Sequence, residues 1–255
     1  MRAVTYQSVQ DAFTSLVGVD ALLTAEQTNF RRSFVSHYRD GWYGALWPFS
    51  ISSTDLAYDG YGQLDLTSIT DLADLLHVYK YDPQKTKSVT EYSFKREGTK
   101  ATIKYHRTTG SATSAATLAG DGTTVVVKYR KQEPTFIGTD YSGSATYAVG
   151  DVIYFDTLDW YKCIDATSAG QSPTTHAAKW TKQEVAYDLS KFTQYRCYVD
   201  WLMADGQHSK AEQAMMFADK FLFDSMDRLE RQSNQSENTK VKLYPAALTE
   251  GSVVL

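Results

Sequence analysis

The strongest periodic signal in the chain is an amphipathic helical pattern near its carboxyl end. Ser209-Lys210-Ala211-Glu212 matches a capping box that opens a helix, and the helical spacing continues to about Gln232. The apolar positions on one face are Ala211, Ala214, Met215, Ala218, Phe221, Leu222, Met226 and Leu229. Because the alanines in this stripe are small, another helix can approach closely, and the pattern predicts a long helix packed into a helical body.

Two apolar residues of this helix, Met216 and Phe223, lie on a different face that the main stripe cannot bury. They are about two helical turns apart in the sequence and are therefore aligned. Either they contact β-structure of the same chain or they form an interface with another subunit. An aligned apolar pair marks an interface better than a single exposed apolar residue does.

Helical patterns also precede this segment. A helix is predicted from Phe192 to Ala204, ended by Gly206, and residues 6–23 can hold a short helix near the amino end. Thr24-Ala25-Glu26-Gln27 matches a capping box that opens another helix. We expect the helices of the two chain ends to pack together.

The helix that follows Thr24 has one clear apolar stripe. Phe30, Phe34 and Tyr38 recur at four-residue spacing, which predicts that they are buried. The polar residues Arg31, Arg32, Arg39 and Asp40 are expected to point elsewhere. Gly41 weakens the helix, and Trp47-Pro48 marks the end of the element.

The segment from Phe49 to Ile137 changes to the short alternating runs of β-strands. Residues 100–105 alternate polar and apolar side chains, and residues 124–129 are rich in β-branched residues. Between His106 and Thr123 the chain consists largely of Thr, Gly, Ser and Ala, which cannot build a core. We interpret this stretch as a long hairpin loop.

A small aromatic module follows, over about 138–184. Its residues Tyr147, Trp160, Tyr161 and Trp180 could stack on sugar rings, because the apolar face of a sugar meets a flat aromatic surface. In so short a module most of these rings must also form the core, and the core role is the stronger expectation. Sugar stacking is kept as the alternative.

The last segment, 234–255, is polar at first and mixed afterwards, with Pro245 and Gly251 breaking any regular element. This composition predicts an extended arm that orders only when it docks. The sequence as a whole therefore predicts an α+β chain. Its parts are a helical body over 1–48 and 185–233, an inserted β-domain over 49–137, the module over 138–184 and the arm over 234–255.

The sequence offers little support for catalysis or for a bound cofactor. Neither a nucleophile elbow nor a phosphate-binding glycine loop is present. Cys163 and Cys197 are far apart in the sequence and form no C-x-x-C motif. The histidines and the Asp55–Asp74 carboxylates do not follow the spacing of metal ligands. A net charge of -4 is not typical of a protein that binds nucleic acid through an overall positive electrostatic potential. We expect neither an enzyme nor a metal or cofactor protein.

Two resemblances add to this interpretation. Thr146-Tyr147-Ala148-Val149-Gly150-Asp151-Val152-Ile153-Tyr154, Trp160-Tyr161-Lys162-Cys163, Gly170-Gln171-Ser172-Pro173 and Trp180 together resemble the small chitin- and cellulose-binding modules found beside bacterial chitinases. In those modules two adjacent exposed aromatic residues follow the Tyr-Lys strand, whereas Asp165-Ala166 stands there in this chain. The resemblance implies the scaffold of such a module without its sugar-binding platform.

The second resemblance covers the flanking parts of the chain. The motifs are Leu16-Val17-Gly18-Val19-Asp20 with Leu23-Thr24, the aromatic helix that ends in Trp42 to Trp47-Pro48, Val78-Tyr79-Lys80-Tyr81-Asp82-Pro83, Val125-Val126-Val127-Lys128-Tyr129-Arg130, and Tyr198-Val199-Asp200-Trp201-Leu202-Met203-Ala204-Asp205-Gly206-Gln207 before an alanine-rich helix. In this order they resemble the head-to-tail adaptor proteins of long-tailed bacteriophages.

That resemblance implies a structural protein of the virion neck, assembled in the host cytoplasm as a twelve-fold ring. Its partners would be copies of itself, the portal protein and a stopper or tail-completion protein, with DNA passing through the channel without sequence-specific binding. Val241, Leu243, Tyr244 and Leu248 of the arm would dock on a neighbouring subunit or on the portal. The loop at 110–122 would face the channel or the next ring. The module would sit on the outside of the particle, where its deletion would spare assembly.

The alternative function is a virion or surface protein that binds host polysaccharide through 138–184.

Overall fold

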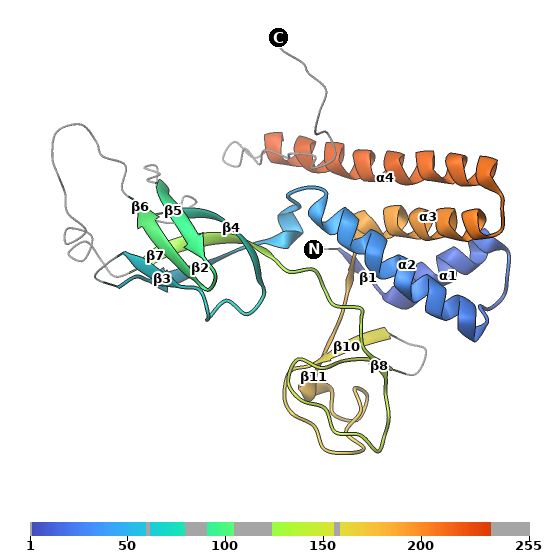
Figure 1. Ribbon diagram of the computed structural model, residues 1–255, viewed down its shortest axis with the longest axis horizontal. Helices are drawn as coiled ribbons and strands as arrows, with labels where there is room; N and C mark the ends of the chain where they lie inside the picture. The colour runs from blue at the N-terminus through green and yellow to red at the C-terminus, as the bar shows by residue number, and fades with distance from the viewer. Residues whose placement is uncertain (1, 60–61, 80–90, 105–123, 156–158, 236–255) are drawn as a thin grey trace, which may run out of the picture. The chain divides into compact units, whose positions relative to one another are not determined.

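The computed structural model describes residues 2–59, 62–79, 91–104, 124–155 and 159–235 (Figure 1). The chain is a mixed α+β protein, as predicted. Its contacts divide the described residues into two compact units. One unit contains residues up to Ala45 together with 133–235, and the other contains Leu46–Gln132. The first unit is thus built from both ends of the chain.

The amino-terminal helices of the first unit are α1 (Tyr6–Val17) and α2 (Thr24–Tyr43). Thr5 caps α1 through its side chain, and Gly18 ends it in a left-handed conformation at φ 80°. The capping box of α2 lies one residue earlier than predicted. Leu23 is the N-cap, and its backbone N–H donates to Glu26 Oε2 over 2.7 Å.

The predicted aromatic stripe of α2 is confirmed. Phe30, Phe34 and Tyr38 are all buried, and Tyr38 Oη accepts a hydrogen bond of 3.1 Å from the backbone of Ala186. α2 packs on α3 (Tyr187–Ala204), which begins earlier than the predicted Phe192. Gly41 lies at this contact, where a Cβ atom would come within 3.0 Å of the Phe192 ring. A small residue at 41 therefore allows the two helices to approach closely.

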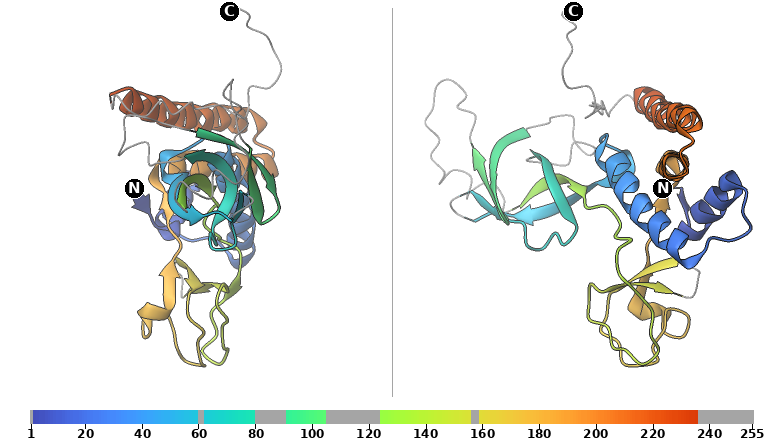
Figure 2. Two further views of the ribbon diagram at one scale, coloured as in Figure 1. Left: turned by 90° about the vertical axis from the view of Figure 1, so that its left-hand side faces the viewer. Right: turned by 45° about the vertical axis from the view of Figure 1, so that its right-hand side comes forward.

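The carboxyl-terminal helices form a hairpin. α4 (His208–Gln235) follows α3 after a turn through Gly206, which has a φ of 73°, and Figures 1 and 2 show the two helices side by side. α4 begins one residue before the predicted Ser209. Ala211, Ala214 and Ala218 are buried as predicted.

Short strands connect the two chain ends within this unit. β1 (Ala3–Val4) pairs antiparallel with β12 (Val185–Ala186), and Ala3 lies opposite Ala186. β12 leads directly into α3, so this pairing holds the start of the chain against the start of its carboxyl-terminal helices.

The second unit is built of β-strands. Its six strands run in the order β2-β7-β4-β5-β6-β3, and every neighbouring pair is antiparallel. The strands are β2 (Ile51–Ala57), β3 (Gln63–Asp65), β4 (Leu72–Tyr79), β5 (Glu91–Glu97), β6 (Lys100–Lys104) and β7 (Thr124–Lys131), after a 3-10 turn at Pro48–Ser50. Leu64, Val78 and Val127 are among its fully buried side chains. The predicted loop at 106–123 lies outside the described residues.

The module is a small sheet in the order β11-β10-β9-β8. Its strands are β8 (Thr139–Asp140), β9 (Val152–Phe155), β10 (Asp159–Cys163) and β11 (Trp180–Lys182), with a 3-10 turn at Ala177–Lys179. β9 pairs with β10 and places Ile153 opposite Tyr161 and Tyr154 opposite Trp160. Since successive strand residues face opposite sides, the two pairs lie on different faces of the sheet.

Candidate assembly surfaces

The outer face of α4 carries exposed apolar side chains. Met216 and Phe223 are 72% and 57% exposed, and Lys220 lies between them on the same line of the helix. At roughly 100° per residue, Met216 lies opposite Ser225, which is buried toward α3. In the part of the chain that the structure describes, α3 is the one element with which α4 shares an extensive contact.

This surface extends beyond the two predicted residues. Met215 was predicted to be core, but it is 41% exposed, and Phe217 is 52% exposed. A single neighbouring helix covers only a narrow stripe of α4, which here consists of the alanines and Ser225. Met215 and Phe217 flank that stripe, and Phe217 still reaches the Tyr195 ring at a centroid distance of 5.9 Å. We call Met215, Met216, Phe217 and Phe223 the α4 outer patch.

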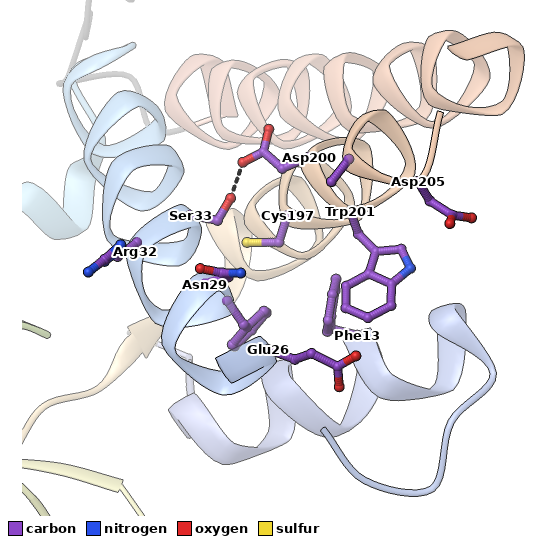
Figure 3. A pocket seen from close by; sticks show the side chains of 11 residues that line it. Phe13, Glu26, Asn29, Arg32, Ser33, Cys197, Asp200, Trp201 and Asp205 are labelled. Carbon is purple, nitrogen blue, oxygen red and sulfur yellow. Dashed lines mark hydrogen bonds between the residues drawn. The ribbon is translucent and has the colours of Figure 1, made fainter. Parts of the chain in front are cut away.

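A pocket opens between α1, α2 and α3, at the end of α3 that precedes the turn into α4 (Figure 3). Its volume is about 620 Å³. Phe13, Phe30 and Cys197 are buried in its apolar floor, and Trp201 lies beside Phe13 with the two rings 6.0 Å apart. Burial raises the pKa of the Cys197 thiol well above its ordinary value, which disfavours the thiolate form.

The rim of this pocket is acidic. Three carboxylates line it, Glu26, Asp200 and Asp205, against one cation, Arg32. Glu26 and Asp205 are held by local contacts, Glu26 with the Leu23 backbone and Asp205 with the side chain of Gln207. An apolar floor under an acidic rim suits an apolar group flanked by positive charge.

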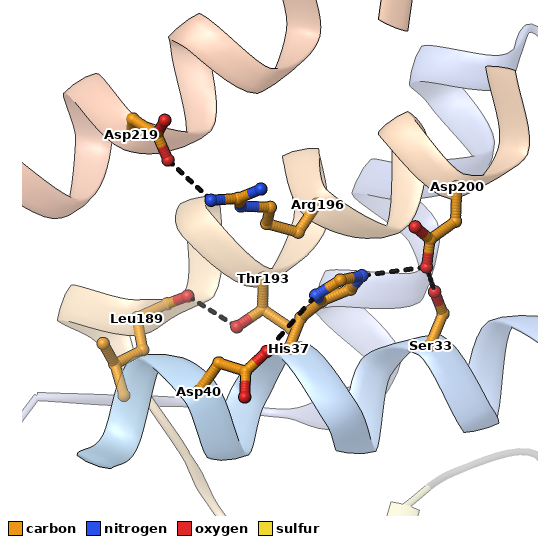
Figure 4. Close-up of polar contacts among 8 residues, drawn as sticks. All are labelled: Ser33, His37, Asp40, Leu189, Thr193, Arg196, Asp200 and Asp219. Carbon is orange, nitrogen blue, oxygen red and sulfur yellow. Dashed lines mark hydrogen bonds and ion pairs between the residues drawn. The ribbon is translucent and has the colours of Figure 1, made fainter. Parts of the chain in front are cut away.

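Asp200 also joins a polar network between α2 and α3 (Figure 4). Ser33 Oγ donates to Asp200 Oδ2, and His37 Nε2 lies 2.8 Å from the same oxygen. Burial raises the pKa of the Asp200 carboxyl, but the hydrogen bonds from His37 and Ser33 outweigh it and hold that pKa below its ordinary value. In a hydrolase triad the serine bonds to the imidazole, whereas here both groups bond to one carboxylate. The network therefore fastens two helices together.

The four aromatic residues considered for sugar stacking do not form an open platform. Tyr147, Trp160 and Trp180 are all less than a tenth exposed, and Tyr161 is half-buried. Tyr147 and Trp180 pack with Ile153 in the core of the module. The buried rings therefore take the core role, the stronger of the two expectations, since stacking on a sugar ring needs an uncovered aromatic face.

Trp160 is buried for a different reason, because it packs against the helical body. Its ring meets that of Tyr6 of α1 edge to face at 6.2 Å. The Arg31 guanidinium of α2 lies over the Tyr154 ring at 4.0 Å and pairs with Asp140 at 3.0 Å. Arg31 was expected to point away from packing, yet it fastens the module to α2. These contacts join the module to the helices, and both belong to one compact unit.

The predicted docking residues of the arm cannot be placed. Val241, Leu243, Tyr244 and Leu248 are outside the described residues. Across the described ranges no cluster of three or more His, Cys, Asp or Glu side chains could hold a metal ion. No helix in those ranges is both apolar enough and long enough to span a bilayer.

Searches against protein-family models and against curated proteins found no match to this chain.

Proposed function

We propose that this chain is a structural virion protein, a head-to-tail adaptor that forms a ring between the portal and the tail. The observation that carries the proposal is the α4 outer patch, in which Met216 and Phe223 lie opposite the face that α3 covers. Full burial of one such side chain contributes about 1.5–3 kcal/mol. In a ring each subunit contacts its two neighbours through two different surfaces, and the α4 outer patch would supply one of them.

The arrangement of the first unit also supports the proposal. The resemblance implies a helical body assembled from both chain ends with β-structure inserted, and α1, α2, α3 and α4 belong to one unit from which Leu46–Gln132 is separate. The strand pair β1–β12 links the two chain ends. A body closed in this way can remain rigid while its outer helix contacts a neighbour.

The partners follow from the same resemblance. The ring would bind the portal on one side and a stopper or tail-completion protein on the other, within the neck of the virion, and it would have the twelve-fold symmetry that the resemblance implies. DNA would pass through the channel, and a net charge of -4 suits a surface that must not hold it.

Electron microscopy of this chain co-expressed with the portal protein tests the proposal. A closed ring attached to the portal is the expected result. Monomers without portal contact would contradict it, and retention of those monomers on chitin would favour the polysaccharide-binding alternative.

A matched pair of variants tests the α4 outer patch itself. Phe223→Asp is expected to leave a folded protomer that no longer forms the ring, because a carboxylate buried in an apolar interface is strongly unfavourable. Val149→Asp makes the same kind of change at a position of the module that is 65% exposed, and it should assemble normally. Light scattering measures the mass and circular dichroism the fold. Normal rings from Phe223→Asp would show that the patch is not the interface.

A further inference from the structure

The pocket between α1, α2 and α3 has a chemistry that the proposed ring does not by itself explain. Apolar side chains form its floor, whereas Glu26, Asp200 and Asp205 make its rim acidic. Its occupant must therefore combine apolar groups with nearby positive charge. A peptide with alternating basic and apolar residues meets this requirement.

The chain itself contains such a peptide after α4. Lys240-Val241-Lys242-Leu243 alternates basic and apolar residues, and Lys240 and Lys242 are the only charged residues between Thr239 and Leu248. In an extended peptide, alternate side chains point to opposite sides. Val241 and Leu243 could enter the apolar floor while the two lysines reach the acidic rim.

The length of α4 determines which copy of the pocket this peptide can reach. α4 has 28 residues and is therefore about 42 Å long. It begins at His208, close to Asp205 at the pocket, and ends at Gln235. Leu243 lies eight residues beyond Gln235, a span of at most about 29 Å even when fully extended. This span is shorter than the roughly 42 Å of α4, so the peptide cannot reach Asp205 at the pocket rim of its own chain.

We propose that residues 240–244 of one copy dock in the α1–α2–α3 pocket of a neighbouring copy. Each copy then gives one arm and receives one, which is a head-to-tail contact of the kind that closes a ring. The inference deepens the proposed function, because it names a contact between ring subunits, but the docking itself needs no portal.

A disulfide trap in the full-length chain tests this docking. The variant Asp205→Cys/Lys242→Cys places one thiol at the pocket rim and one on the arm. Cys197 lines the floor of this pocket and is replaced by Ala in this variant and in its control, whereas Cys163 is buried in the module and should not compete during mild oxidation. Non-reducing electrophoresis is expected to show a ladder of covalent oligomers that collapses on reduction.

The control Val149→Cys/Lys242→Cys moves the first thiol to an exposed position on the module, away from the pocket. It should give less than about a tenth of the cross-linked product. A free peptide covering residues 236–250 should reduce the ladder of the pocket variant by competing for the site. The same peptide with Leu243→Asp should not.

The outcomes separate this inference from the proposed function. A ladder that extends past dimers supports both the docking and a ring. Dimers alone support the docking and contradict the ring. A monomeric product, or a ladder equally strong in the control, overturns the docking even if rings with the portal are seen.

Discussion

Helices α2 and α4 both carry apolar stripes, but they differ in how much of their surface the unit covers. The stripe of α2 is enclosed by α1, α3 and the segment around Phe136, and Phe34 contacts the rings of Tyr6 and Phe136 at 4.8 and 5.1 Å. α4 packs on α3 alone among the elements with extensive contacts in the described chain. Of its other apolar residues, Phe221, Leu222, Met226 and Leu229 are half-buried, whereas the α4 outer patch, led by Met216 and Phe223, stays exposed.

The difference shows that apolar periodicity alone does not determine which apolar residues of a helix are buried. A helix surrounded by neighbours buries a broad stripe, whereas a helix at the edge of a unit buries only the part that faces its one partner. Apolar residues beyond that part are available for another subunit. The two helices therefore predict opposite results for substitutions of the same kind.

The largest effect on stability is expected in α2. Phe34→Ala should lower the free energy of unfolding by about 3–5 kcal/mol, because it leaves a cavity among packed aromatic rings. The matched variant Phe223→Ala should change the stability of the protomer by no more than about 0.5 kcal/mol, since this ring is largely exposed. Urea unfolding under conditions where both variants are monomeric measures the two values. Equal losses would remove the distinction between the helices.

Trp160 extends the enclosed core of α2 into the module. Trp160→Ala should cost about 3 kcal/mol, and the helical body should lose stability together with the module, because the ring packs on Tyr6. The circular dichroism of the helices should then melt at a lower temperature. Unchanged melting of the helices would show that the module is a separate decoration. Deletion of the module is for the same reason expected to harm the body, contrary to the sequence-based expectation that assembly would be spared.

Much of the first unit could be predicted from local patterns. Large aromatic residues at four-residue spacing predicted the buried face of α2, and the alanines predicted the face of α4 that meets α3. The capping box of α2 lies one residue earlier than predicted. The N-cap donates its backbone N–H to Glu26, and any residue, Leu23 included, can supply a backbone N–H. Met215 was misplaced because the number of partners around a helix is a tertiary property.

The features that bring distant residues together were not predictable in the same way. The pocket joins Glu26 to Asp200 and Asp205 through the packing of three helices, and nothing near any of these residues signals the others. The contact of the module with the body did have a local signal. β9 and β10 have large apolar residues on both faces, Ile153 and Phe155 on one and Tyr154 on the other, as a sheet covered on both sides requires.

The smallest effect concerns the polar edge of the α2–α3 contact. The lowered pKa of Asp200 means that its ionised form stabilises the fold at pH values above the ordinary Asp pKa, near 4, and that this contribution is lost as the pH falls through the lowered value. Asp200→Asn should therefore cost about 0.5 kcal/mol at pH 7, a modest amount because the carboxyl is half exposed. The difference between wild type and variant should shrink toward pH 3.

Urea unfolding between pH 7 and pH 3 measures this difference, with Asp224→Asn as the control on the exposed face of α4. A pH-independent difference would mean that Asp200→Asn removes a packing contact and not a charge, and that the hydrogen bonds from Ser33 and His37 do not depend on ionisation. A difference that shrinks as predicted would show that α2 is fastened to α3 by charge at its edge as well as by aromatic packing at its centre. The packing that encloses α2, and that α4 does not have, would then depend on both apolar contacts and an ionic contact.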